Sequence, residues 1–146
     1  MTFRFRRSRP SDLPILLDVW RRAVAATHDF VLAEDLNAID RIVATDYLPG
    51  ADLLLAVDKD DRPVGFLGGS GREIESLFVE PSAHGQGVGT ALIEEFARGS
   101  DGDLTVEVNE QNVGACRFYE RRGFRLIGRL DDDRDGRPYP LLLLAR

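Results

Sequence analysis

The feature that most constrains this chain is a glycine-rich loop between a strand-like segment and a helix-like segment. Residues 73–79 alternate polar and apolar side chains, as half-buried strands do. The loop His84-Gly-Gln-Gly-Val-Gly89 follows, and after it Leu92, Ile93 and Phe96 recur at helical spacing. Glycines let a backbone approach a ligand closely, and a helix N-terminus favours an anion. The loop therefore predicts a phosphate-binding site, or, as the plainer alternative, a tight connection between strand and helix.

Two common phosphate-binding loops do not fit this segment. A Walker loop ends in Gly-Lys followed by Ser or Thr, and the sequence has no such ending here. The dinucleotide-binding fingerprint has a different glycine spacing and follows the first strand of its fold, whereas this loop lies in the middle of the chain. Neither motif therefore identifies the role of this loop.

The rest of the chain alternates between strand and helix patterns from end to end. Strands are expected at residues 3–6, 53–57, 64–67, 73–79, 104–108, 124–130 and 139–144. Helices are expected at about 11–24, 34–47, 90–96 and 112–122, the first with Ser11 as its N-cap. This order predicts an α/β fold with a mixed sheet of about six or seven strands and about four helices. No linker or repeat divides the 146 residues, so we expect a single domain over residues 1–146.

Composition excludes several classes of function. The net charge of −6 disfavours nucleic-acid binding, which needs a basic surface, and weakly favours a positively charged acceptor such as an amine. A single cysteine, Cys116, leaves no partner for an internal disulfide and argues against a cysteine-based zinc site. No apolar run approaches the ~18 residues of a membrane span, and the N-terminus lacks the apolar core of a signal peptide. We expect a cytoplasmic protein with no bound metal and no membrane partner.

A second motif, at residues 109–124, allows a more specific comparison. It holds Asn109-Glu-Gln-Asn112 at a strand end, then a helix with Phe118-Tyr119, closed by Gly123-Phe124. Taken in this order, the two motifs resemble the GCN5-related N-acetyltransferase (GNAT) family, and the resemblance covers nearly the whole chain, most closely to small bacterial members. The family's Arg/Gln-x-x-Gly-x-Gly/Ala motif falls on His84, Gly87 and Gly89. Its later motif falls on Asn112, Ala115, Phe118, Tyr119, Gly123 and Phe124.

The resemblance implies a mostly antiparallel sheet that splays apart at an acetyl-CoA cleft. It implies that acetyl-CoA is bound by Leu77, Phe78, Val79, His84, Gly85, Gln86, Gly87, Val88, Gly89, Thr90, Asn109, Asn112, Phe118 and Tyr119. The family prefers Arg or Gln where His84 stands. Because such a loop holds phosphate mainly through backbone N–H groups, this departure should weaken binding rather than abolish it.

The resemblance also implies direct acetyl transfer to a primary amine, without a covalent enzyme intermediate. Tyr119 matches the family's general acid, and a phenol with a pKa of about 10 can donate a proton at neutral pH; the alternative is a core aromatic. Glu73 and Glu75, on one face of their strand, are candidates for the general base, or else a solvated face. His28 is a third candidate, since imidazole titrates near neutral pH. Its alternative role is a hydrogen bond within its own loop, through Asp29.

These expectations combine into an acetyl-CoA-dependent N-acetyltransferase acting on a protein lysine or on a small-molecule amine. A non-catalytic acyl-CoA-binding module of the same fold is the alternative. An acetyltransferase acting on charged transfer RNA is disfavoured by the acidic composition. The resemblance implies that residues 24–47 and the hairpin near Tyr139 select the acceptor, and the protein is expected to be a monomer or a homodimer.

Overall fold

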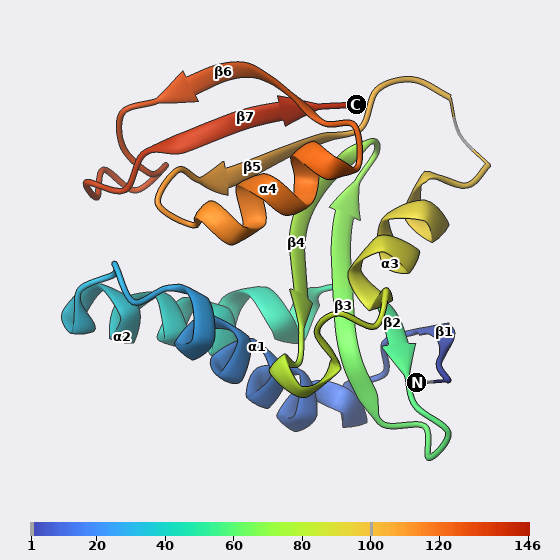
Figure 1. The fold of residues 1–146 in the computed structure, drawn as a ribbon. Coiled ribbons are helices and arrows are strands. Elements are labelled where there is room, and N and C mark those ends of the chain that lie inside the picture. The colour runs from blue at the N-terminus through green and yellow to red at the C-terminus, as the bar shows by residue number, and fades with distance from the viewer. Residues whose placement is uncertain (1, 100) are drawn as a thin grey trace.

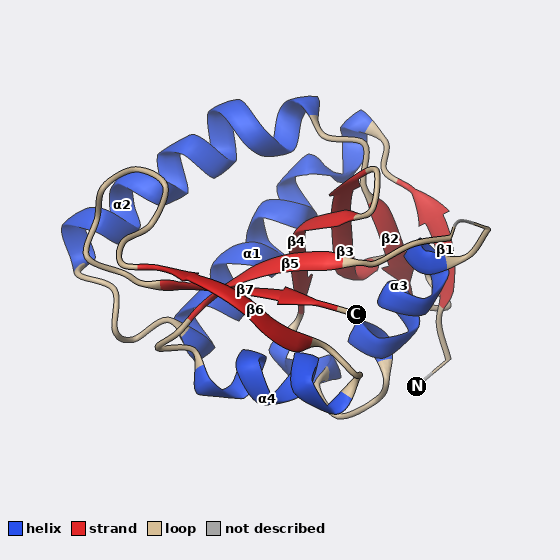
Figure 2. Ribbon diagram, turned by 90° about the horizontal axis from the view of Figure 1, so that it is seen from above, coloured by secondary structure: helices blue, strands red, loops and turns tan. Residues whose placement is uncertain are grey.

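Seven strands form one sheet in the order β1-β2-β3-β4-β5-β7-β6, and helices cover both of its faces (Figures 1 and 2). The computed structural model describes residues 2–99 and 101–146. The strands are β1 (Arg4–Arg7), β2 (Leu54–Val57), β3 (Pro63–Ser70), β4 (Glu73–Val79), β5 (Thr105–Asn109), β6 (Arg125–Leu130) and β7 (Leu141–Ala145). The helices are α1 (Leu13–Thr27), α2 (Ala33–Ile42), α3 (Val88–Ala97) and α4 (Val113–Arg121). The predicted α/β class and its order of elements are confirmed.

The sheet divides between β4 and β5. All other neighbouring strands pair antiparallel, whereas β4 and β5 are parallel and pair only at Glu73 with Thr105 and at Ile74 with Val106. Beyond these two pairs the strands diverge (Figure 1). The mostly antiparallel, splayed sheet expected from the resemblance is confirmed, and the opening between β4 and β5 positions the site described below.

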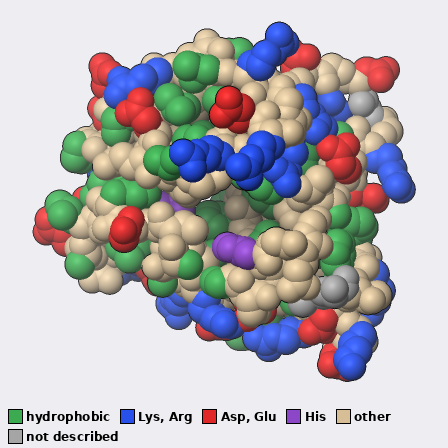
Figure 3. All heavy atoms as spheres, viewed as in Figure 1, with side chains coloured by type: hydrophobic (Ala, Val, Ile, Leu, Met, Phe, Trp, Pro, Cys, Tyr) green, Lys and Arg blue, Asp and Glu red, His purple; other side chains and the backbone are tan. Residues whose placement is uncertain are grey.

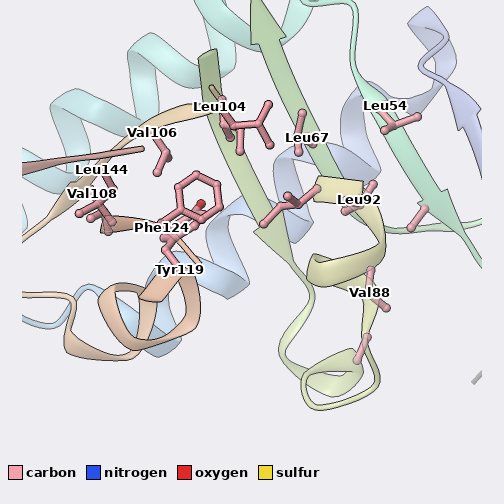
Figure 4. Close-up of a cluster of buried hydrophobic side chains, with 14 of the residues drawn as sticks. Leu54, Leu67, Val88, Leu92, Leu104, Val106, Val108, Tyr119, Phe124 and Leu144 are labelled. Atoms are coloured by element: carbon pink, nitrogen blue, oxygen red, sulfur yellow. The ribbon is translucent and has the colours of Figure 1, made fainter. Parts of the chain in front are cut away.

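Side chains from β2 show how the sheet holds a core on each face. Leu55 and Val57 pack with α1 and with Phe66 of β3, whereas Leu54 and Ala56 belong to the core under α3 and α4. This follows from the alternation of side chains along a strand. The α3 side contributes Leu92 and Ile93, which are fully buried; Figure 4 shows Leu92 beside Leu67, with Tyr119 and Phe124 nearby. Each such buried side chain contributes about 2 kcal/mol to folding.

The predicted end of β3 is wrong, because the strand continues through Gly68 and Gly69 to Ser70. These glycines are needed for close packing rather than for a turn. A Cβ atom on Gly68 would lie 2.3 Å from the hydroxyl oxygen of Tyr47, and one on Gly69 would lie 2.4 Å from the ring of Phe96. Both contacts come from elements distant in sequence.

The first helix begins later than predicted, because Ser11 lies in a 3-10 turn (Pro10–Asp12) and α1 starts at Leu13. The Asp12 carboxylate accepts a hydrogen bond from the Arg9 backbone N–H at 2.7 Å. It also receives two hydrogen bonds of 2.8 Å from the Arg6 guanidinium, and both side chains are about nine-tenths buried. This pair fixes the start of α1 against β1.

Helix α2 is followed by a π-helical turn (Val43–Tyr47), a 3-10 turn (Leu48–Gly50) and then β2. A further 3-10 turn (Pro81–Ala83) joins β4 to the glycine-rich loop. In the described part of the chain, no helix has the length and apolar character that crossing a membrane requires.

Candidate active site

A cleft of about 670 Å³ opens where β4 leaves β5. Its walls come from the end of α1, the last residues of β4, the glycine-rich loop, the start of α3, and α4. Figure 3 shows a hollow in the face seen in Figure 1, with Lys or Arg side chains along one rim and a histidine along the opposite rim. The lining residues are Ala23, Thr27, His28, Leu77, Phe78, Val79, Ala83, His84, Gly85, Gly87, Val88, Gly89, Thr90, Asn112, Gly114, Ala115, Phe118, Tyr119, Arg121 and Arg122.

The glycine-rich loop forms one wall in a conformation that few other residues adopt. Gly85 and Gly87 have φ angles of 77° and 81°, in the left-handed region that favours glycine. Gly87 is also the N-cap of α3, so the unpaired N–H groups and partial positive charge of this helix start lie at the cleft. At Gly89, a Cβ atom would lie 3.0 Å from the Phe118 ring on the opposite wall. The loop thus has the donors and the space for a phosphate group.

Tyr119 belongs to both the core and the cleft. It is 6% exposed, and its ring lies edge-on to those of Phe118 and Phe124, at centroid distances of 5.3 and 5.2 Å. Burial raises the pKa of its hydroxyl above the ordinary value of 10, so the group stays protonated at neutral pH. Tyr119 therefore packs in the core and also lines the cleft, so a core role does not exclude a role as a general acid.

His28 follows α1 directly and lines the cleft. Its Nδ1 lies 2.7 Å from the Oγ1 of Thr27, rather than binding within its loop through Asp29. The Thr27 hydroxyl donates to the Ala23 carbonyl at 2.9 Å, so its oxygen accepts from Nδ1 and leaves Nε2 as the lone-pair nitrogen of the neutral ring. Burial lowers the pKa of His28, while a hydrogen bond with the Asn109 side chain and the charge of Asp29 oppose this.

The two asparagines of the second motif have different positions. Asn112 lines the cleft and caps α4, its Oδ1 accepting from the Ala115 backbone N–H at 3.1 Å. Asn109 ends β5 and is not among the lining residues, but its side chain lies near enough to His28 to raise the pKa of the imidazole. Asn109 thus supports a residue of the cleft.

Three further predicted residues also fall outside the lining. The Gln86 side chain donates to the Ser82 carbonyl at 3.2 Å. Glu73 and Glu75 are exposed on β4. Pairing with β3 passes from Ser76 opposite Gly68 to Ile74 opposite Gly69, so Glu75 is an extra, bulged residue. Exposed and buried residues nevertheless alternate from Glu73 to Ser76, so both glutamates stay exposed to solvent.

Two arginines on α4 and just beyond it line the cleft without having been predicted. Arg122 donates from Nε to the Oγ1 of Thr90 at 2.7 Å and from Nη1 to the Phe118 carbonyl at 2.9 Å. Its guanidinium carbon lies 3.8 Å from the centroid of the Phe118 ring. A signal was present in the sequence, because Arg121 and Arg122 follow Phe118 by three and four residues and so share its helix face. The other unpredicted lining residues are Ala23, Thr27, Ala83, Gly114 and Ala115.

The sequence of the central region matches a known family. Residues 49–126 match the acetyltransferase (GNAT) domain. Together with the fold and the cleft, this match shows that the chain belongs to the GNAT family of acetyl-CoA-dependent N-acetyltransferases.

Individual relatives match over almost their full length. The chain is 43% identical to the peptidyl-lysine N-acetyltransferase YjaB of Escherichia coli strain K12, covering 99% of this chain and 97% of the relative. It is 42% identical to YjaB of Salmonella typhimurium strain LT2, covering 99% and 98%. The solution structure of apo YjaB from E. coli superposes with a TM-score of 0.93, covering 99% and 97%. The PaiA N-acetyltransferase of Thermoplasma acidophilum, solved with coenzyme A, shares the fold alone, with a TM-score of 0.80, 20% identity and coverage of 100% and 99%.

Proposed function

We propose that this protein transfers the acetyl group of acetyl-CoA to the side-chain amine of a lysine in a protein or peptide. The observation that carries the proposal is the placement of Tyr119 and His28, one proton donor and one proton acceptor, in the same cleft. The acceptor class is supported by the two relatives with 42–43% identity over nearly the full chain, whose names specify peptidyl-lysine.

The residues of the cleft fit acetyl-CoA. The start of α3 and the left-handed glycines offer backbone donors for its phosphates, and Arg121 and Arg122 add positive charge. The last residues of β4 face the gap that β5 leaves, so this part of the strand edge has no pairing with β5. Bound acetyl-CoA supplies the thioester that is attacked and the thiolate that leaves.

Tyr119 is proposed to hold the proton for the leaving thiolate. Its hydroxyl stays protonated at neutral pH, because burial raises its pKa. The rings of Phe118 and Phe124 fix its orientation. A positioned acid of this kind contributes about 10²–10⁴-fold to a rate.

His28 is proposed to take the proton from the attacking amine. A lysine amine has a pKa of about 10.4, so making it neutral near pH 7.4 costs about 4 kcal/mol. With Nδ1 donating to Thr27, the basic nitrogen of His28 is Nε2, and burial lowers the pKa of the ring, which favours its neutral form at physiological pH. Glu73 and Glu75 are the alternative bases; they are exposed and do not line the cleft, so an acceptor amine would reach them from outside it.

Two measurements test this function. Calorimetric titration with acetyl-CoA should give saturable binding, with free CoA and a dinucleotide as controls. Release of CoA should then follow addition of lysine-containing peptides, and mass spectrometry should place the acetyl group on the lysine side chain. Binding without turnover on any amine would indicate the non-catalytic alternative, and turnover on small amines alone would contradict the peptide acceptor.

A further inference from the structure

The Arg122 guanidinium is held beside the first turn of α3 without a negative partner. Its bonds to the Thr90 hydroxyl and the Phe118 carbonyl use Nε and Nη1. Within residues 2–99 and 101–146, no carboxylate lies within ion-pair distance of Arg122, and the first turn of α3 contains no acidic residue. The N-terminus of a helix carries about half a positive charge. Two positive groups therefore meet at the cleft, and an anion between them would relieve their repulsion.

His84 is a poor candidate for the side-chain cation at this loop. Its Nε2 lies 2.9 Å from the Val79 carbonyl oxygen, which can only accept, so Nε2 is the donor. Only Nδ1 is then left to face a ligand, so His84 offers a phosphate fewer donors than an arginine at this position would. A positively charged side chain that contacts a phosphate at this loop must therefore come from another element.

The attachment of Arg122 prepares both it and Thr90 for an anion. Because the Thr90 oxygen accepts from Arg122, its own hydroxyl proton is free to donate. Stacking on Phe118 holds the guanidinium in one plane, and its Nη2 group has no acceptor among the described residues. Both side chains line the cleft.

We propose that Arg122 binds the pyrophosphate of acetyl-CoA from the α4 side and supplies the positive charge that His84 does not. The proposal depends on the proposed function, because it assumes that acetyl-CoA occupies the cleft. The pyrophosphate is the phosphate group assigned, since Thr90 places Arg122 at the helix start where backbone donors converge.

Calorimetry on Arg122→Gln tests this assignment. The substitution removes the charge but keeps hydrogen-bonding atoms, and affinity for acetyl-CoA should fall about tenfold or more. Arg117→Gln is the matched control, because Arg117 is exposed on α4, lies outside the cleft, and loses the same charge. Its affinity should change less than about twofold. His84→Arg in the Arg122→Gln background should recover most of the lost affinity.

Fragments of the ligand separate the possible outcomes. Dephospho-CoA keeps the pyrophosphate, so Arg122→Gln should weaken its binding as much as that of acetyl-CoA. S-acetylpantetheine has no phosphate, so its binding should be the same in the variant and the wild type. A loss confined to ligands with the 3′-phosphate would overturn the pyrophosphate assignment. Unchanged affinity in Arg122→Gln, with a thermal transition like that of the wild type, would refute the role of Arg122 alone. No binding by the wild type would instead refute the proposed function.

Discussion

The Oγ1 of Thr27 accepts a hydrogen bond from Nδ1 of His28, and this contact decides which imidazole nitrogen carries the proton. The Thr27 hydroxyl proton is already used on the Ala23 carbonyl. The Nε2 lone pair is therefore the basic position of His28 in the cleft. The groups that act on the ring from nearby are Asp29 on its own loop and Asn109 at the end of β5.

Replacing His28 by Gln should lower kcat/KM about 100-fold at pH 7, in the range of a lost general base. In the wild type, kcat/KM should decrease on the acid side of the pH profile, its acid limb, as His28 becomes protonated. Because burial lowers the pKa of His28, the apparent pKa of this decrease should lie below the ordinary value of 6.5. The measurement is a pH profile of kcat/KM with a lysine peptide, in which His28→Gln should lose that limb. Thr27→Val keeps the shape but removes the acceptor at Nδ1, and should give an intermediate loss. An unchanged limb in His28→Gln, with the limb lost in Glu73→Gln, would assign the base to Glu73.

Tyr119→Phe should lower kcat at least about 100-fold while leaving the affinity for acetyl-CoA unchanged. The ring and its contacts with Phe118 and Phe124 remain, and only the hydroxyl is lost. Steady-state kinetics and calorimetry on one preparation separate the two effects. Tyr47→Phe is the control, because the Tyr47 hydroxyl bonds Ser76 and does not line the cleft. Equal turnover in wild type and Tyr119→Phe would remove Tyr119 as the acid.

Gly87→Val should abolish measurable acetyl-CoA binding, because the side chain strains the loop and redirects its N–H groups. The φ angle of 81° costs a β-branched residue about 1–2 kcal/mol. Gly136→Val is the matched control, with a φ angle of 80° in the hairpin between β6 and β7 and likewise open space around its Cβ position. Both variants should lose similar stability in thermal unfolding, but calorimetry should show lost binding only for Gly87→Val. Equal binding by the two would contradict the phosphate role of the loop.

Asp12→Ala should lower the free energy of unfolding by about 3 kcal/mol, because it removes the buried acceptor of two Arg6 hydrogen bonds and leaves only the more exposed Asp61 as an ionic partner. Asp52→Ala breaks an exposed ion pair with Arg7, which neighbours Arg6 on β1. This variant should lower the free energy of unfolding by less than about 1 kcal/mol. Urea unfolding at pH 7 gives both values. Similar losses in the two variants would contradict the importance assigned to burial.

The same pair predicts a pH dependence of stability. The Arg6 guanidinium lowers the pKa of Asp12 in the folded protein below its ordinary value of 3.8. The unfolded chain therefore binds more protons in this range, so the contribution of Asp12 is complete above about pH 4 and is lost as the pH falls through the folded-state pKa. Urea unfolding between pH 3 and pH 7 should show a steeper acid-side loss for wild type than for Asp12→Ala.

Local patterns in the sequence were sufficient to predict most elements, since period and turn residues are local properties. Strand β4 has the predicted limits, and α4 lies within one residue of the predicted helix at 112–122. The end of β3 was missed because Gly68 and Gly69 respond to Tyr47 and Phe96, which only the fold brings near. A glycine pair alone does not distinguish a turn from a close contact.

The site shows the same division between local and distant information. The loop and Tyr119 were found because their motifs are continuous in sequence. Cofactor binding by Asn109 stays a prediction, whereas its effect on the pKa of His28, more than 80 residues earlier, depends on the fold and could not be predicted from the motif. The position of Arg122 depends on Thr90 in another helix, so the motif alone did not reveal it.

The two backbone pairs between β4 and β5 have a consequence for how the protein opens. Strands β1–β4 and strands β5–β7 each pair within their own set, and among the described residues the two sets pair with each other only at these two positions. The core beneath α3 and α4 and side-chain contacts such as those of Arg122 with Thr90 and of Tyr139 with Asp35 also join the halves. The cleft can widen by bending at the Glu73–Thr105 end without breaking a ladder within either half. A ligand that contacts both halves acts as a clamp, so hydrogen exchange should slow on occupancy even at amides far from the ligand.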